Sequence, residues 1–250
     1  MELAFERRGT GAPLILIHGI GHHWQAWLPV MDRLAASRTV IAIDLPGFGV
    51  SPGLPEGIPY TAESLADAVE SFCARLGVRE PHVAGNSLGG YIALELASRG
   101  VVRSATALSP VGFWSRPELR YAQAVLRALK AGTRFGATPF LSGASAGILV
   151  AHPSRLEPQA LAAAAQALSG ASGFDETLES FAGLMPPAPP KSPITIAWGE
   201  RDRLLLRRQA VRAARWSGQR VKLLKSCGHV PMSDDPELVA RVILEASATS

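Results

Sequence analysis

The hydrophobic positions of this chain form two kinds of segment. Short runs of consecutive apolar residues predict strands buried on both faces, as in a parallel sheet covered by helices. Longer segments with apolar residues every three or four positions predict amphipathic helices. The early strands are expected at residues 14–17, 39–43, 82–84 and 106–108, and the helices between them at 27–36, 62–76 and 87–98. This alternation predicts right-handed crossovers and an α/β fold with a doubly wound, mostly parallel sheet.

The alternation stops between residues 114 and 190. That segment is rich in alanine, and helices are expected at residues 117–130, 158–168 and 174–185. It ends in Pro-Pro-Ala-Pro-Pro at residues 186–190, which is typical of a stiff, extended connector. The sheet pattern then returns, with strands expected at 194–198 and 221–224 and helices at 204–216 and 236–246. We therefore predict an α/β core of residues 1–113 and 191–250, with a helical cap (lid) of residues 114–190 inserted near its middle.

Composition narrows the class of protein. Of the 250 residues, 47% are hydrophobic and 18% are charged, which suits a sizeable core and excludes a disordered chain. No apolar run reaches the roughly 18 residues that a membrane span needs. Residues 1–8 lack the apolar stretch of a secretory signal. The two cysteines, Cys73 and Cys227, are too few for a disulfide framework, so we expect a cytoplasmic, reducing location.

The charge pattern and the spacing of polar residues argue against several partners. The net charge is +4, but the basic residues are scattered, so no nucleic-acid partner is expected. No Gly-x-Gly-x-x-Gly follows an early strand, which makes a dinucleotide site unlikely on sequence grounds. His22 and His23 alone do not make a metal site, and no other metal-ligand spacing is present. We expect no cofactor and no metal.

The most informative motif is the Gly-x-Ser-x-Gly pattern at residues 85–89. It lies directly between a predicted strand and a predicted helix. A tight turn there forces Ser87 into a strained backbone, and Gly85 and Gly89 relieve the crowding around it. The Ser87 hydroxyl is then exposed at the sheet edge, and the amides at the helix N-terminus face any developing negative charge. Ser87 is therefore a candidate nucleophile, against the alternative of an ordinary turn that carries a chance serine.

Five motifs in this order resemble the α/β-hydrolase family over nearly the full length of the chain. Residues 18–21, His-Gly-Ile-Gly, resemble the family's oxyanion loop, and residues 44–49 match its Asp-x-x-Gly-x-Gly segment. Residues 85–89 match its nucleophile turn. Residues 199–202 lie where the family carries its catalytic acid, and residues 228–231 resemble the loop with its catalytic histidine. The insertion falls where many members carry a lid over the active site.

The chemistry of three residues is consistent with this resemblance. A serine hydroxyl needs a base within hydrogen-bond reach, and a carboxylate on the second nitrogen of that base fixes its tautomer. The order Ser87, Asp202, His229 along the chain is the hydrolase-fold order, and each residue follows a predicted strand. The resemblance further implies an oxyanion hole made by the backbone amides of Ile20 and Leu88. Gly19 and Gly21 stay open as alternatives to Ile20.

Other polar residues compete for these roles. Among the histidines, we expect His18 to pack behind the oxyanion loop, whereas His22 and His23 either line the pocket or lie on the surface; His82 and His152 are less suitably placed. Among the acids, Asp44 is a minor alternative to Asp202, Glu200 stands two residues too early, and Asp234 and Asp235 are expected to cap the last helix. Five apolar cap residues could line the pocket or belong to the core: Leu141, Ile148, Leu149, Phe174 and Phe181.

These observations predict a serine hydrolase that cleaves a small carboxylic ester, thioester or lactone through an acyl-enzyme on Ser87. One alternative is a carbon–carbon bond hydrolase of ring-fission diketones, whose nucleophile turn residues 85–90 resemble. Those enzymes usually carry tryptophan directly after the histidine, and this chain has Val230. Another alternative is a small-molecule receptor on the same fold, which would turn its ligand over slowly or not at all. We expect a small-molecule ester-like substrate and a monomer or homodimer.

Overall fold

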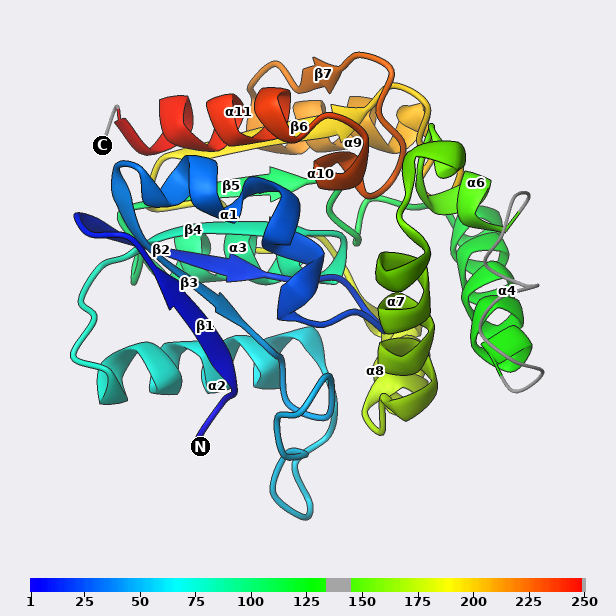
Figure 1. Ribbon diagram of the computed structural model, residues 1–250, viewed down its shortest axis with the longest axis horizontal. Helices are drawn as coiled ribbons and strands as arrows, with labels where there is room; N and C mark the ends of the chain where they lie inside the picture. Colours follow the sequence, from blue (N-terminus) through cyan, green and yellow to red (C-terminus); the bar gives the residue numbers. More distant parts are fainter. Residues whose placement is uncertain (134–144, 249–250) are drawn as a thin grey trace.

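A sheet of seven strands runs through the centre of the molecule (Figure 1). The computed structural model describes residues 1–133 and 145–248. Within them the strand order is β1-β3-β2-β4-β5-β6-β7; β1 pairs antiparallel with β3, and the other neighbours are parallel. The strands are β1 (Phe5–Arg8), β2 (Ala12–Ile17), β3 (Arg38–Ile43), β4 (His82–Asn86), β5 (Ser104–Leu108), β6 (Ile194–Gly199) and β7 (Lys222–Leu224). The prediction of a doubly wound, mostly parallel sheet is confirmed.

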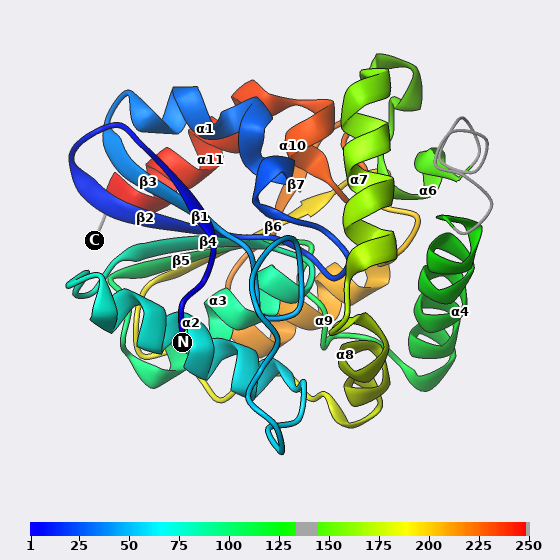
Figure 2. The ribbon, with the colours of Figure 1, turned by 60° about the horizontal axis from the view of Figure 1, so that its bottom comes forward.

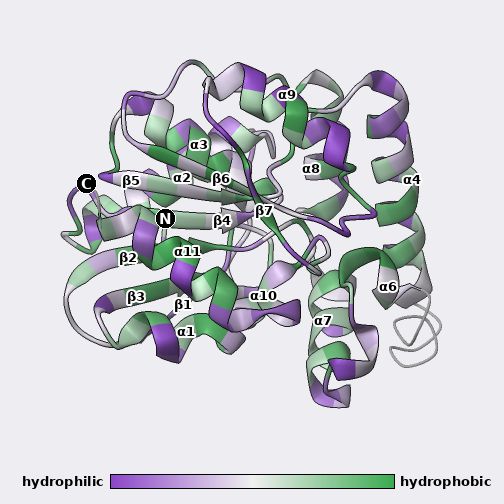
Figure 3. Ribbon diagram, turned by 90° about the horizontal axis from the view of Figure 1, so that it is seen from above, coloured by the Kyte–Doolittle hydropathy of each residue, from purple (hydrophilic) through white to green (hydrophobic). Residues whose placement is uncertain are grey.

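Helices cover both faces of this sheet, as Figures 1 and 2 show. One face carries α1 (Leu28–Ala35), α10 (Pro231–Asp234) and α11 (Pro236–Ala248). The opposite face carries α2 (Ala62–Arg75), α3 (Leu88–Arg99) and α9 (Arg207–Ser217). Hydrophilic and hydrophobic residues alternate along α9 and α11, as expected of helices with one buried side (Figure 3).

Each face of the sheet has its own hydrophobic core. In β2, Ile15 and Ile17 belong to the core under α2 and α3, whereas Leu14 and Leu16 belong to the core under α1 and α11. Successive side chains of a strand point to opposite faces, so a strand between two layers of helices must be apolar at every position. This requirement explains why the strands are visible in the sequence as continuous apolar runs.

Several element boundaries differ from the sequence prediction, each for a local reason. Strand β1 was not predicted, because its sequence Phe-Glu-Arg-Arg is polar and partly exposed at the sheet edge. The helix expected from residue 204 begins at Arg207, because the preceding amides of Leu204 and Leu205 donate to Asp202 instead. The helix expected over 174–185 ends at Ser180, and the short helices α6 and α10 were not predicted.

The helices between β5 and β6 form one group beyond the carboxyl ends of the parallel strands (Figure 1). They are α4 (Arg116–Thr133), α6 (Ala146–Leu149), α7 (Pro158–Gly170) and α8 (Phe174–Ser180), and we call them the helical insertion. No strand occurs among the described residues between β5 and β6. The division of the chain at residues 113 and 191 into core and cap stays a prediction.

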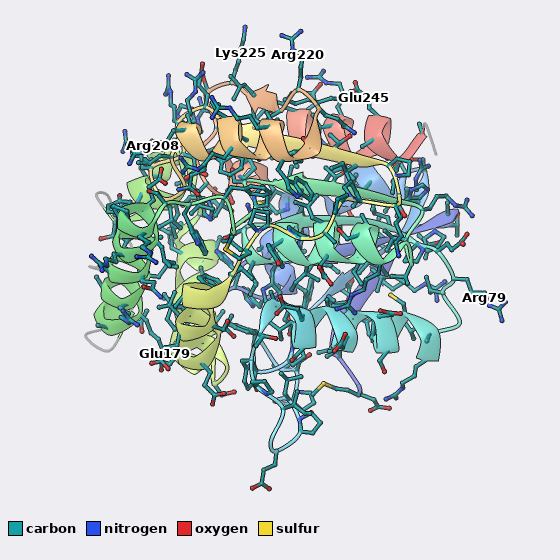
Figure 4. All side chains as sticks on the ribbon, turned by 180° about the vertical axis from the view of Figure 1, so that it is seen from behind. Arg79, Glu179, Arg208, Arg220, Lys225 and Glu245 are labelled. Atoms are coloured by element: carbon teal, nitrogen blue, oxygen red, sulfur yellow. The ribbon has the colours of Figure 1, made fainter. Side chains whose placement is uncertain are left out.

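A buried carboxylate links the start of the helical insertion to the core. Glu118 of α4 is 2% exposed and forms ion pairs with Arg208 and Arg212 of α9. It also accepts hydrogen bonds from the amide and the hydroxyl of Ser115, at 2.6 and 2.7 Å. Burial alone would raise the pKa of Glu118, but these hydrogen bonds and the two arginines hold it below its ordinary value. In Figure 4, Arg208 lies between the ribbons of α9 and α4, whereas Arg220, Lys225 and Glu245 project outward.

Candidate active site

The turn between β4 and α3 holds Ser87 in a strained conformation. Its φ is 56° and its ψ is −115°, a region that residues with a Cβ seldom occupy. A Cβ on Gly85 would lie 2.0 Å from the carbonyl oxygen of Gly89, and a Cβ on Gly89 would lie 2.1 Å from that of Ile17. Only glycine fits at both places, which is the physical reason for the Gly-x-Ser-x-Gly spacing. Ser87 thereby lies on the wall of a pocket.

His229 and Asp202 are joined directly. The distance between His229 Nδ1 and Asp202 Oδ2 is 2.9 Å, and both side chains are buried. The other oxygen, Asp202 Oδ1, accepts the amides of Leu204 and Leu205 at 3.0 and 2.8 Å. An ionised carboxylate only accepts hydrogen bonds, so Nδ1 is the protonated nitrogen of His229. This assignment leaves Nε2 free to accept a proton.

Ser87 and His229 line the same pocket, which also contains Gly19, Ile20 and Asn86. Within the described part of the chain, no hydrogen bond joins the Ser87 hydroxyl to the His229 imidazole. Such bonds are often long or misaligned without substrate and shorten when it binds. The fold therefore brings all three predicted residues together, with one of the two expected hydrogen bonds formed.

The loop that carries His229 is held by residues outside the predicted set. Asn86 donates from Nδ2 to the carbonyl of His229 at 2.9 Å and to that of Leu108 at 3.1 Å. The Val230 amide donates to the carbonyl of Leu149 in α6 at 2.8 Å. Asn86 was part of a recognised motif, but its sequence position gave no signal for this role, because its partner His229 lies 143 residues away.

Asp234 corrects a sequence prediction. It was expected to cap the last helix, but only Asp235 does so, accepting the amide of Leu238 at 2.9 Å. Asp234 instead accepts three amides: Gly228 at 2.7 Å, next to His229, and Ala151 and His152 at 2.9 Å each, in the helical insertion. Its carboxylate thus ties the histidine loop to the segment after α6.

The loop of residues 18–21 packs against the serine turn. A Cβ on Gly19 would lie 3.2 Å from Ser87 Cβ, so the two backbones are in close approach. His22 donates its amide to Gly19 O at 3.1 Å, which closes a turn with Ile20 and Gly21 at its centre. Among the described residues, the amides of Ile20 and Leu88 have no hydrogen-bond acceptor. Both are therefore available to an oxyanion, although the position of the reacting oxygen is set by a substrate.

His18 lies behind this loop, as predicted. Its Nδ1 contacts Gly19 O at 2.7 Å and its Nε2 accepts the amide of Leu45 at 3.0 Å, which places the proton on Nδ1. Burial lowers the pKa of His18 to about 4, so the ring is neutral at neutral pH. Its fixed hydrogen bonds give it a positioning role, and it does not compete with His229 as a base.

Asp44, the minor alternative for the catalytic acid, holds backbone instead. It accepts the amides of Trp24 at 2.7 Å and Val50 at 3.0 Å. A Cβ on Gly49 would lie 2.1 Å from Asp44 Oδ2, so the glycine of the Asp-x-x-Gly-x-Gly segment makes room for this carboxylate. Burial raises the pKa of Asp44, partly opposed by the two amides. The carboxylate bonded to His229 is that of Asp202.

The remaining candidates fall into two groups. His22 lines the pocket of Ser87 and His23 lines a neighbouring groove, so the surface alternative does not apply to either. Of the five apolar cap residues, Leu149 lines the pocket, Phe174 and Phe181 are buried core residues, Ile148 packs against that core, and Leu141 lies outside the described residues. Cys227 is buried, and burial raises the pKa of its thiol to about 12.

The described residues contain neither a candidate metal cluster nor a candidate membrane-spanning helix. Across 1–133 and 145–248, no group of three or more histidine, cysteine, aspartate or glutamate side chains is arranged to hold a metal ion. In the same ranges, no helix has the length and apolar character needed to cross a bilayer.

Curated relatives align with part of the chain. One is the dihydrolipoyllysine-residue acetyltransferase component of the acetoin cleaving system from Cupriavidus necator, 39% identical over 116 residues that cover 45% of this chain and 30% of the relative. A second is the pimeloyl-acyl-carrier protein methyl ester esterase from Aeromonas salmonicida, 37% identical over 39% of this chain and 36% of the relative. A third is 2-hydroxymuconate semialdehyde hydrolase from Pseudomonas sp., 42% identical over 36% of this chain and 33% of the relative. The matches span about a third of the length of these relatives.

Solved structures resemble the whole chain. A membrane phospholipase A, described as a bacterial virulence factor, has a TM-score of 0.80 and 26% identity, covering 99% of this chain and 84% of that one. An esterase from Thermogutta terrifontis has a TM-score of 0.78 and 24% identity, covering 99% and 93%, and its likeness concerns the fold alone. The model of the alpha/beta hydrolase family matches residues 14–242. The sequence match, the parallel sheet and the strained serine turn agree, and the chain belongs to the alpha/beta hydrolase family.

Proposed function

We propose that this hydrolase is a serine esterase that cleaves small carboxylic esters, thioesters or lactones through an acyl-enzyme on Ser87. One observation carries the proposal. His229, whose Nδ1 is hydrogen-bonded to Asp202 Oδ2 at 2.9 Å, lines the same pocket as Ser87, which is held at a φ of 56°. A base oriented by a carboxylate, in the same pocket as a serine hydroxyl, is the arrangement that nucleophilic acyl transfer requires.

The reaction has two halves. Ser87 Oγ attacks the substrate carbonyl while His229 Nε2 accepts the hydroxyl proton, and the bond to the leaving alcohol then breaks as Nε2 returns that proton to the alcohol oxygen. A water molecule then hydrolyses the acyl-enzyme: it gives a proton to Nε2 as its oxygen bonds to the acyl carbon, the bond between that carbon and Ser87 Oγ breaks, and Nε2 returns the proton to Oγ, which releases the carboxylic acid. Asp202 stays ionised and stabilises the imidazolium formed in each half.

The backbone amides of Ile20 and Leu88 are proposed to stabilise the tetrahedral intermediates. Both lack an acceptor among the described residues, and the Leu88 amide stands at the start of α3, where the helix dipole favours negative charge. A donor of this kind contributes about 3 kcal/mol to the transition state in enzymes where it has been measured. His18, through its bond to Gly19 O, keeps the loop of Ile20 against the serine turn.

The helical insertion is proposed to act as a cap over this pocket. Leu126 and Leu129 of α4 and Leu149 of α6 line it together with the core residues. An apolar cover excludes water and strengthens the electrostatic interactions inside.

Steady-state hydrolysis of p-nitrophenyl acetate by the wild-type and Ser87→Ala proteins tests the proposal. We expect turnover by the wild type and a loss of at least about 10⁴-fold in the variant, because the nucleophile is removed. A fluorophosphonate probe should add its mass to Ser87 in the wild type alone. Turnover that survives in folded Ser87→Ala protein would overturn the serine mechanism.

A second function has one observation in its favour. The match to 2-hydroxymuconate semialdehyde hydrolase is 42% identical, although it covers only 36% of this chain. The ring-fission diketone alternative predicts hydrolysis of that semialdehyde faster than of any simple ester. Val230 occupies the position after His229, where the resemblance leads us to expect tryptophan in such enzymes. Esters are therefore the preferred substrates to test first.

A further inference from the structure

A second, larger hollow adjoins the pocket of Ser87. It has a volume of about 500 Å³ and lies between the start of α1 and the helix α7. We call it the α7 groove. Its volume falls in the range of ligand sites, and neither the serine nor its base lines it. The pocket that holds Ser87 is much smaller, at about 50 Å³.

The groove shares part of its wall with the catalytic pocket. Four residues line both hollows: His22, Leu149, Ala164 and Val230. Val230 directly follows His229, and His22 follows the proposed oxyanion loop. These four side chains therefore form the boundary between the hollows, which one substituent of an ester held at Ser87 has to pass to enter the groove.

The groove has an apolar wall made by small residues. Ala160, Ala163 and Ala164 share one face of α7, because residues three and four apart are neighbours on a helix. Their short side chains leave the space open, and Leu161 and Leu156 border it. Opposite them, Leu28 is 41% exposed, so apolar surface faces the groove from the core as well.

The charges around the groove disfavour anionic ligands. Glu157 is the one charged side chain among its described lining residues, and no lysine or arginine lines it. The pKa of His22 is lowered to about 3 and that of His23 is also lowered, in both cases mainly by burial, so the two rings add no positive charge at neutral pH. A carboxylate or phosphate would lose its hydration without gaining a partner.

We propose that the α7 groove binds an uncharged hydrocarbon chain of the substrate while the ester bond lies at Ser87. This inference rests on the proposed esterase function and assigns its substrate class: esters with one long apolar substituent. The shared boundary of the two hollows, the alanine residues of α7 and the absence of lysine and arginine among the described lining residues carry it. This hydrocarbon chain is part of either the acyl group or the alcohol group of the ester.

The first test is a chain-length series with matched variants. Each methylene buried in the groove should raise kcat/KM about fourfold in p-nitrophenyl esters from acetate to decanoate, until the groove is full. Ala163→Phe places a ring in the groove and should remove most of this gain. Ala162→Phe is the control, because Ala162 is the neighbouring residue of α7, is similarly half-buried, and lines neither hollow. Ala160→Phe, at an exposed position of the groove, is the second blocking variant.

The outcomes separate the groove from the esterase function. A gain with chain length that is lost in Ala163→Phe and Ala160→Phe and kept in Ala162→Phe supports the groove. Acetate hydrolysis without any such gain, or a gain equal in all variants, overturns the groove and leaves the esterase function standing. If no ester is turned over, calorimetric titration of the wild type with 1-octanol and 1-butanol decides: tighter binding of 1-octanol that Ala163→Phe abolishes supports the groove, and equal binding overturns it.

A pair of isomeric esters then shows which substituent of the ester occupies the groove. Octyl acetate and methyl nonanoate contain the same atoms and differ only in which side of the ester bond carries the long chain. The isomer whose kcat/KM falls in Ala163→Phe, relative to Ala162→Phe, has its chain in the groove. Equal rates for both isomers in both variants would overturn the inference.

Discussion

The α/β core and the helical insertion differ in the kind of interaction that their residues make around the two hollows. In the core, carboxylates fix the loops at the sheet edge by accepting backbone amides: Asp44 accepts those of Trp24 and Val50, and Asp202 those of Leu204 and Leu205. In the insertion, the residues of α7 that border the groove are alanine and leucine apart from Gln159, so this surface is mostly apolar. The core thus has directional contacts where the insertion presents a smooth surface.

The difference is consistent with the proposed role of each region. Acyl transfer requires atoms placed within a fraction of an ångström, which hydrogen bonds on rigid strand ends supply. Enclosing a hydrocarbon chain requires only volume and apolar surface, because the hydrophobic effect has no direction. Two carboxylates join the two regions: Asp234 accepts amides from both the His229 loop and the insertion, and Glu118 of α4 pairs with two arginines of α9.

The largest predicted effect belongs to the core. Asp202→Asn should lower kcat by roughly 10³- to 10⁴-fold with little change in KM, because an amide favours the wrong tautomer of His229. Glu118→Gln is the corresponding change in the insertion, and it should lower the midpoint of urea unfolding while kcat changes less than about threefold. Equal losses of kcat in the two variants would contradict the division between the regions.

An intermediate effect is expected at the link between the regions. Asp234→Asn replaces an acceptor of three amides by a group that also donates, so the His229 loop loses part of its support. We expect kcat to fall about 10- to 100-fold, with KM for p-nitrophenyl acetate nearly constant.

Asp235→Asn provides the matched control for that variant. Asp235 is the neighbouring residue and caps α11, away from the His229 loop. Asparagine is as good an N-cap as aspartate, so its kcat and stability should stay close to wild type. Asp234→Glu, which keeps the charge, should recover part of the lost activity. A fall in kcat of the same size in both asparagine variants would rule out a specific role for Asp234.

The smallest effect concerns stability and pH. His22 Nδ1 is buried without a hydrogen-bond partner, and burial, with smaller contributions from His23, His18 and His229, lowers the pKa of His22 to about 3. An unfolded histidine titrates near 6.5, so between pH 6.5 and 3 the unfolded chain binds the proton and the folded protein does not. Wild-type stability therefore falls as the pH falls through this window.

His22→Leu removes that contribution. The slope of the free energy of unfolding against pH should become shallower by up to about 1.4 kcal/mol per pH unit below pH 6.5, measured by urea denaturation at several pH values. His18, which also titrates abnormally, is retained in both proteins and contributes equally to each. An unchanged slope would mean that His22 is protonated in the folded protein.

The fold was predictable from the sequence because its central strands, β2 to β6, are mostly buried on both faces. They therefore appear as short, mainly apolar runs, and the one missed strand, β1, is a polar edge strand that lacks this signal. The nucleophile turn was equally readable, since steric crowding at Gly85 and Gly89 depends on a few neighbouring residues and their strand contacts. The start of α9 was misplaced because the Leu204 and Leu205 amides bind a side chain, which periodicity does not reveal.

The sequence alone therefore determined the buried strands, the serine turn and the order of Ser87, Asp202 and His229 along the chain, because apolar runs and short motifs are visible in it directly. Folding decided the rest. Asp234 reaches Ala151 across 83 residues, and Asn86 reaches the His229 carbonyl across 143. The α7 groove is likewise bounded by segments from both regions. Hydrogen bonds and cavities between distant segments depend on how helices pack, and no periodicity in the sequence records that packing.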